Sequence, residues 1–125
     1  MRDLIFRGKA KTDGRWIISD SIHQEAGRVY LYDEVKDIDV EVIPDTVGQY
    51  TGLTDNKGVN IFEGDIVAGA ARWLERMRNG LVAFRWGSFG SIWYRGDIKE
   101  FNPFTSMCNV ECEIIGNIHD NGDLL

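Results

Sequence analysis

Hydrophobic and polar residues alternate with a period of two along much of this chain. The clearest run is 38–42, in which Ile38, Val40 and Val42 share one face and acidic residues lie between them. That period is typical of a β-strand, because successive side chains of a strand point to opposite faces of its sheet. Further runs of alternating, β-branched or aromatic residues cover 3–7, 15–18, 28–32, 61–67, 81–86, 91–94 and 110–115. Strands at this spacing predict an all-β protein with few or no helices.

Turn residues separate the predicted strands. Segment 55–58, Asp-Asn-Lys-Gly, is typical of a turn, since an Asx side chain caps its own backbone and glycine allows positive φ. Residues 87–90 are expected to join two strands as a hairpin loop, and His23 is expected in a loop. Segment 70–78 stays open between a short helix and a strand, because its apolar residues fit both periods about equally well.

The composition excludes several classes of protein. The chain has 125 residues, of which 43% are hydrophobic, and its four Trp, four Tyr and six Phe argue against disorder. No run approaches the roughly 18 apolar residues of a membrane span, and the charged segment 1–11 does not resemble a secretory signal. We therefore expect a cytoplasmic protein with no membrane partner.

The two cysteines are predicted to be free thiols. Cys108 and Cys112 are four residues apart, which places them about 13 Å apart on a strand, and that is too far for a disulfide. A zinc site that adds His119 is disfavoured, because the residues between the cysteines resemble a strand instead of the turn of a zinc knuckle. We expect no metal ion and no cofactor.

Three blocks of sequence carry a family resemblance. The central block, 46–67, contains Gln-Tyr-Thr-Gly-Leu and then Glu-Gly-Asp-Ile-Val, and the other blocks are 1–7 and 113–125. Together they resemble the YopX-like family of phage and prophage proteins. The chain departs from the family pattern at His119, where an aromatic residue is common, and at Gly122, where proline is common.

The resemblance implies a mostly-β fold whose C-terminal part is an SH3-like barrel. We accordingly expect a small β-barrel-like N-terminal region over residues 1–60, packed on an SH3-like barrel over residues 61–125, with the two forming one compact unit. The resemblance also implies a phage or prophage origin and a place in the host cytoplasm. It implies no established activity, so it transfers no catalytic residue to this chain.

The Glu63-Gly64-Asp65 motif has a structural and a catalytic interpretation. In a turn that enters a strand, Gly64 supplies unusual backbone geometry and Asp65 accepts backbone hydrogen bonds. Glu63 and Asp65 would also lie about 6–7 Å apart on one face of an extended chain, a spacing compatible with acid–base chemistry. Nothing else in the sequence completes such a site, so we favour the structural interpretation. The same interpretation covers Gly52, Gly116 and Asn117.

Arginine and aromatic residues interleave between positions 72 and 95. Guanidinium groups contact phosphates and exposed rings stack on bases, which favours nucleic-acid binding, whereas Arg and Trp are also enriched at protein interfaces. The competing interpretation is that the rings fill the core and the Arg stems cover it, and on a strand Arg85 and Trp86 would point to opposite faces. The candidate binding residues are Arg72, Trp73, Arg76, Arg78, Arg85 and Trp86.

The formal net charge of −6 is distributed unevenly. Residues 1–15 carry +3, residues 33–45 carry −5, residues 66–96 carry +4 and residues 110–125 carry −4. Such segregation favours a protein partner or self-association into a homo-oligomer. We therefore predict a phage or prophage accessory protein that is a non-enzymatic binding or assembly module.

Two other functions remain open from the sequence. The first is nucleic-acid binding through residues 72–95. The second is a small hydrolase or nuclease-like enzyme that uses Glu63 and Asp65, and its only further support is that SH3-like barrels occur among ribonuclease toxins, which is an analogy between folds.

Overall fold

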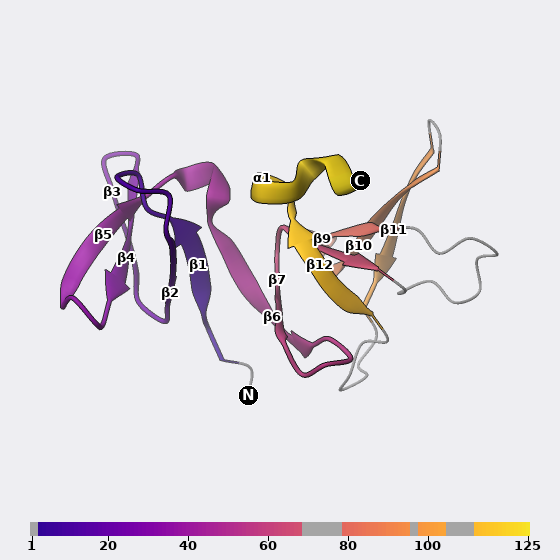
Figure 1. Cartoon of the computed structure of the whole chain (residues 1–125), viewed down its shortest axis with the longest axis horizontal. Coiled ribbons are helices and arrows are strands. Elements are labelled where there is room, and N and C mark those ends of the chain that lie inside the picture. The colour runs from indigo at the N-terminus through magenta and orange to yellow at the C-terminus, as the bar shows by residue number, and fades with distance from the viewer. Residues whose placement is uncertain (1–2, 69–78, 96–97, 105–111) are drawn as a thin grey trace. The chain divides into compact units, whose positions relative to one another are not determined.

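The computed structural model describes residues 3–68, 79–95, 98–104 and 112–125 (Figure 1). The question of helix or strand in segment 70–78 lies outside the described residues. Within them, the prediction of an all-β protein with few helices is confirmed. The strands are β1 (Phe6–Lys9), β2 (Trp16–Ser19), β3 (Ile22–Glu25), β4 (Arg28–Asp33), β5 (Ile38–Val42), β6 (Gly48–Thr54), β7 (Asn60–Phe62), β8 (Asp65–Ala68), β9 (Gly80–Arg85), β10 (Ser88–Arg95), β11 (Ile98–Pro103) and β12 (Glu113–Asn117).

Little helix accompanies these strands. A short helix, α1 (Ile118–Asn121), follows β12 directly (Figure 1), and the 3-10 turns are η1 (Pro44–Thr46) and η2 (Gly122–Leu124). No helix among the described residues has the length and apolar character needed to cross a membrane.

The chain divides into two compact units, Met1–Tyr50 and Thr51–Leu125. Within the described residues the sheets are open and antiparallel. The first unit holds the sheet β3-β4-β5 and a second sheet in which β1 lies between β2 and the start of β6. The second unit holds the sheet β11-β10-β9-β8-β12, and there the end of β6 lies beside β7. The domain division after residue 60, the barrel-like N-terminal region and the SH3-like barrel stay predictions.

The first unit has its own hydrophobic core. It is built from the buried residues Ala10, Ile17, Val29, Leu31 and Val42. These residues come together because the β4–β5 register pairs Val29 with Val42, and a bridge between Ala10 and Val42 joins the end of β1 to β5. The strand predicted at 38–42 is β5, although Ile38 is 50% exposed because it lies beside the β4–β5 turn.

β3 is a strand that the sequence does not predict. All four of its residues are exposed, including His23, which was expected in a loop. The expectation is wrong because β3 forms by backbone pairing with β4, in which His23 lies opposite Tyr30, and not by burial of a hydrophobic face.

A buried carboxylate closes the β4–β5 hairpin. Asp33 accepts hydrogen bonds from the backbone N–H groups of Val35 at 3.0 Å and Lys36 at 3.4 Å. The guanidinium of Arg15 donates to the same carboxylate at 2.9 Å. This side-chain hydrogen bond is the largest of the effects that hold the pKa of Asp33 below its ordinary value.

The core of the second unit lies on one face of its five-stranded sheet. Ile61, Val67, Val82 and Cys112 are buried there, with Phe104 and Ile114 packed against them. The register explains the shared face, since β8 pairs Val67 with Gly80 of β9 and with Ile114 of β12.

Candidate binding surface

The β9–β10 hairpin turns through two residues, Trp86 and Gly87. Arg85 pairs with Ser88 at the end of the ladder, and the φ angles of Trp86 and Gly87 are 48° and 78°. Positive φ at both central residues is typical of a type I′ turn, which matches the twist of paired strands. Glycine adopts this conformation freely, whereas a side chain with a Cβ is strained in it by about 1–2 kcal/mol. The predicted hairpin is confirmed, but its turn is Trp86–Gly87 and not 87–90, because β10 begins at Ser88.

Trp86 is displayed at the tip of this hairpin. Its side chain is 87% exposed, and its ring meets the ring of Phe101 edge-to-face, with centroids 5.6 Å apart and planes at 68°. Gly90 makes room for Phe101, because a Cβ at that position would lie 2.7 Å from Cζ of Phe101 and 2.4 Å from the carbonyl oxygen of Asn102. The turn thus fixes one edge of the indole and leaves most of its surface in solvent.

Tyr94 and Lys99 continue the same face of the sheet. The β10–β11 register pairs Ile92 with Phe101 and Tyr94 with Lys99, so the side chains of Phe101 and Lys99 lie on one face. Nζ of Lys99 lies 6.0 Å from the centroid of the Tyr94 ring, within the range of a cation–π contact. We call Trp86, Tyr94, Lys99 and Phe101 the hairpin surface.

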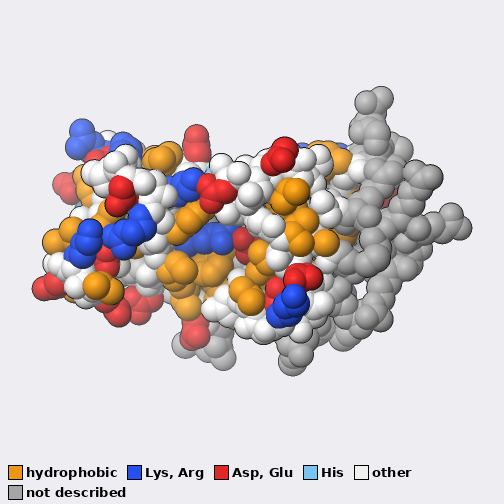
Figure 2. Space-filling view, in the orientation of Figure 1, with side chains coloured by type: hydrophobic (Ala, Val, Ile, Leu, Met, Phe, Trp, Pro, Cys, Tyr) orange, Lys and Arg blue, Asp and Glu red, His pale blue; other side chains and the backbone are white. Residues whose placement is uncertain are grey.

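Other exposed hydrophobic side chains lie elsewhere on the molecule. In the space-filling view, hydrophobic side chains are visible between acidic and basic ones (Figure 2). Phe84, on the opposite face of the same hairpin, is 46% exposed and packs edge-to-face on Phe89 with centroids 4.9 Å apart. Single exposed hydrophobic residues are normal, so the hairpin surface is set apart by its strained turn and by the cation beside its rings.

The structure brings two of the predicted binding residues together at one hairpin. Arg85 is exposed beside the hairpin surface, and its Nη1 donates to the carbonyl of Phe84 at 3.3 Å. Strand alternation does not relate Arg85 to Trp86, because β9 ends at Arg85 and Trp86 lies in the turn. The remaining predicted residues, Arg72, Trp73, Arg76 and Arg78, lie outside the described residues.

Lys99 and Phe101 belong to the hairpin surface but were missed by the sequence analysis. Their segment, 98–103, has no regular alternation. It becomes β11 through its pairing with β10. The one local signal is an aromatic residue two positions after a lysine, which is too common to single out.

The Glu63-Gly64-Asp65 motif forms the turn between β7 and β8. Gly64 has a φ of 89°, and its N–H donates to the carbonyl of Val82 at 2.9 Å. Asp65 is 2% exposed and accepts a hydrogen bond from the N–H of Phe62 at 2.8 Å. This geometry favours the structural interpretation of the motif over the catalytic one.

The C-terminal motif residues begin the helix that follows β12. The side-chain oxygen of Asn117 accepts hydrogen bonds from the N–H groups of His119 and Asp120, both at 3.0 Å, which is an N-cap. A Cβ on Gly116 would lie 2.6 Å from Oδ1 of Asn121. Gly52 lies in β6 with a φ of 86°. All three residues thus fit a structural interpretation.

Asp55 connects the turn at 55–58 to β12. It is 2% exposed, and its carboxylate accepts hydrogen bonds from the N–H groups of Lys57, Val59 and Ile114 at 2.9, 2.9 and 3.1 Å. Burial raises its pKa, but these backbone donors and the charge of Lys57 outweigh burial, so the net shift is downward.

Cys112 is buried in the core of the second unit as a free cysteine. Burial and then the charges of Asp55 and Asp65 raise the pKa of its thiol to about 12, whereas the other cysteine lies outside the described residues. Within the parts of the chain that the structure describes, no group of three or more His, Cys, Asp or Glu side chains is placed to hold a metal ion.

Comparison with known proteins identifies a family and a solved structure with a similar fold. The family described as YopX protein matches residues 5–125. Protein EF1440 from Enterococcus faecalis has a crystal structure that is similar to this chain, with a TM-score of 0.57 and 22% sequence identity, over 100% of this chain and 99% of that one. At this identity the likeness concerns the fold alone. A search of curated proteins found no match.

Proposed function

The chain belongs to the YopX protein family, and on that premise we propose that it is a phage or prophage accessory protein that acts in the host cytoplasm as a non-enzymatic binding module. The hairpin surface is the part that contacts its protein partner. This proposal keeps the prediction made from the sequence and assigns it to four described residues.

The display of Trp86 carries the proposal. A type I′ turn favours Asn or Gly at the position that Trp86 occupies, so a strained and 87% exposed tryptophan has no benefit for the turn itself. Tryptophan, tyrosine and arginine are enriched among the residues that dominate binding energy at protein interfaces. Tyr94 lies on the same face, with Nζ of Lys99 over its ring.

The alternatives have less support from the described residues. Nucleic-acid binding relies on many cations, and at this hairpin the described ones are Arg85 and Lys99 in a chain of net charge −6. An acid–base pair of Glu63 and Asp65 is disfavoured because Asp65 is 2% exposed and bonded to the backbone.

A photo-crosslinking amino acid at position 86 tests the proposal in host cells that carry the phage or prophage. We expect covalent capture of a discrete protein. The matched control is position 59 in the same unit, since Val59 is also exposed, at 52%, and should capture no discrete partner. The captured protein is then purified, and Trp86→Ala should weaken its binding about 30-fold or more, with Val59→Ser unchanged. Capture of nucleic acid, equal capture at both positions, or no capture would overturn the proposal.

A further inference from the structure

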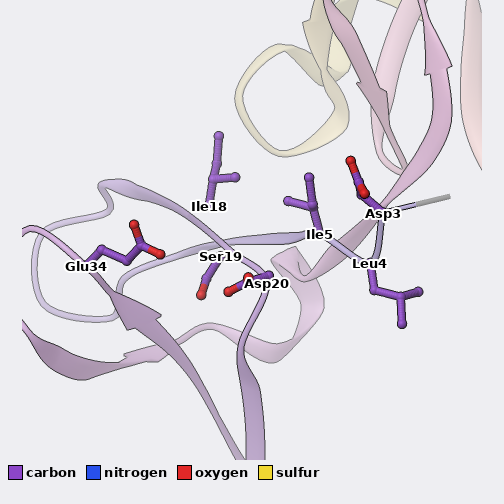
Figure 3. Close-up of a pocket in the computed structure, with 7 residues that line it drawn as sticks. All are labelled: Asp3, Leu4, Ile5, Ile18, Ser19, Asp20 and Glu34. Atoms are coloured by element: carbon purple, nitrogen blue, oxygen red, sulfur yellow. The ribbon is translucent and has the colours of Figure 1, made fainter. Parts of the chain in front are cut away.

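A groove in the first unit is lined by carboxylates, whereas the hairpin tip of the second unit projects and carries Arg85. It has a volume of about 590 Å³ and is lined by Asp3, Leu4, Ile5, Ile18, Ser19, Asp20 and Glu34 (Figure 3). We call it the N-terminal groove. Three of its lining residues are aliphatic and three are carboxylates, and none is a cation.

The aliphatic side of the groove is unusually exposed. Leu4 and Ile18 are 59% and 62% exposed. Ile18 follows the alternation of β2, in which its neighbours Ile17 and Ser19 are buried, so its side chain points away from the core. Figure 3 shows the Ile5 and Ile18 side chains projecting to the same side. This wall can receive a large apolar group.

The carboxylates of the groove lack ion pairs within the described part of the first unit. Among the described residues, no ion pair involves Asp3, Asp20 or Glu34. The Asp20 and Glu34 side chains point toward one another from separate segments (Figure 3). A group that enters the groove with a positive charge beside an apolar ring would therefore satisfy both sides.

The same chain displays such a group on its second unit. Trp86 is 87% exposed at the hairpin tip and is preceded by exposed Arg85. The groove volume falls within the range of about 300–1,000 Å³ that is typical of sites for small ligands, so it is large enough for one indole. The indole is uncovered by its own chain, and the carboxylates are complementary to the guanidinium beside it.

We propose that the Trp86 hairpin of one copy of this protein inserts into the N-terminal groove of a second copy. Trp86 packs on Ile5 and Ile18, while Arg85 pairs with the carboxylates at the rim. This inference rests on the proposed function and names a second copy as the partner. The contact joins two different surfaces, so it either closes a ring or extends a chain of copies.

The contact is small, so assembly depends on concentration. One hairpin tip covers less than the roughly 1,200–2,000 Å² of a standard stable interface. We therefore expect a reversible equilibrium between monomers and larger species in which Trp86 acts as the hot spot.

Sedimentation velocity of the full chain over a concentration series measures this equilibrium. Wild type is expected to sediment faster as concentration rises, and Trp86→Ala should raise the dissociation constant about 30-fold or more. Val59→Ser, which also replaces an exposed hydrophobic side chain of the same unit, should leave the dissociation constant unchanged. Circular dichroism confirms that each variant is folded.

Mixing complementary variants tests whether the contact is between copies. Trp86→Ala keeps the groove but lacks the indole, and Ile18→Lys keeps the indole but places a cation in the groove. Each alone should remain monomeric, and an equimolar mixture should form a heterodimer. If Ile18→Lys does not fold, Asp20→Asn with Glu34→Gln replaces it, because both side chains are exposed.

The outcomes separate this inference from the proposed function. A wild type that is monomeric at every concentration, variants that assemble as wild type does, or a mixture that stays monomeric would overturn the inference. If crosslinking at position 86 still captures a host protein in that case, the proposed function stands without self-association. If neither occurs, both are wrong.

Discussion

Asp55 offers a sharp test of how the second unit is held together. Its Oδ1 accepts hydrogen bonds from the backbone N–H groups of Lys57 and Val59, each at 2.9 Å. Its Oδ2 accepts one from the N–H of Ile114 at 3.1 Å. Asp55→Ala removes all three acceptors at a position that is 2% exposed.

The size of the effect follows from where the three donors lie. Lys57 and Val59 are exposed, so their N–H groups can turn to water, and each lost bond costs about 0.5–1.5 kcal/mol. The N–H of Ile114 is held in β12, and a donor left unpaired in such a place costs about 1–3 kcal/mol. We therefore expect Asp55→Ala to lower the free energy of unfolding by about 2–6 kcal/mol.

The pH dependence of this difference has a definite sign. Burial opposes ionisation of Asp55, but the backbone donors and Lys57 together leave its pKa below the ordinary value of 3.8. A carboxylate with a depressed pKa stabilises the folded state above its unfolded pKa, and that contribution is lost as the pH falls through the folded pKa. The gap between wild type and Asp55→Ala should therefore narrow below about pH 3.8.

Urea unfolding at a series of pH values measures the difference. Asp55→Asn is the matched variant, because its amide oxygen can keep the bonds to Lys57 and Val59 but its NH₂ cannot accept from Ile114, so it should retain part of the stability. Asp39→Ala, at an exposed position of β5, should change stability by less than about 0.5 kcal/mol. A loss for Asp55→Ala no larger than that, or a gap independent of pH, would refute the reasoning.

Three further changes have expected outcomes. Gly90→Ala should lower the free energy of unfolding by about 1–3 kcal/mol, because the added methyl overlaps Phe101, and unchanged stability in urea would contradict that close approach. Asp33→Asn should make the stability of the protein less dependent on pH in acid. The hydrogen bond from Arg15 lowers the pKa of Asp33 below 3.8, so the stabilisation by this carboxylate in wild type is lost as the pH falls through the folded pKa. The Tm values of variant and wild type should converge in acid, and a constant difference would argue against the ion pair. Cys112, with its pKa raised to about 12, should resist alkylation at mildly alkaline pH until urea is added. Peptide mass spectrometry measures alkylation of Cys112, and rapid alkylation of the folded protein would contradict the prediction.

Sequence patterns identify strands where the side chains themselves decide the structure. β5 coincides with the alternating run at 38–42, and the Asx turn at 55–58 contains the predicted capping residue, Asp55. In both cases neighbouring residues carry the information. β3 and β11 were missed because backbone pairing with a neighbouring strand forms them, without a buried alternating face.

The candidate site likewise has features that the sequence indicates and features that only the fold creates. The Arg and Trp content of residues 72–95 indicated the segment that contains the hairpin surface. Sequence reasoning misplaced Trp86, because bulky residues seldom adopt positive φ and a glycine follows it. The N-terminal groove was not predicted, since its lining comes from residues 3–5 before β1, from β2 and the residue after it, and from the β4–β5 turn, which only the folded chain brings together.

The hydrogen bond between Asp55 and Ile114 has a consequence for how the protein is made. The two residues are 59 positions apart, and β8 likewise finds its neighbour β12 late in the chain. During translation the buried edge at Ile66 and Val67 emerges well before the strand that covers it. The core residues of the first unit lie between 10 and 42, so this unit can fold before β12 has been synthesised. A chain truncated between β8 and β12 would therefore have a folded first unit and an unpaired edge at β8, and an unpaired strand edge promotes aggregation.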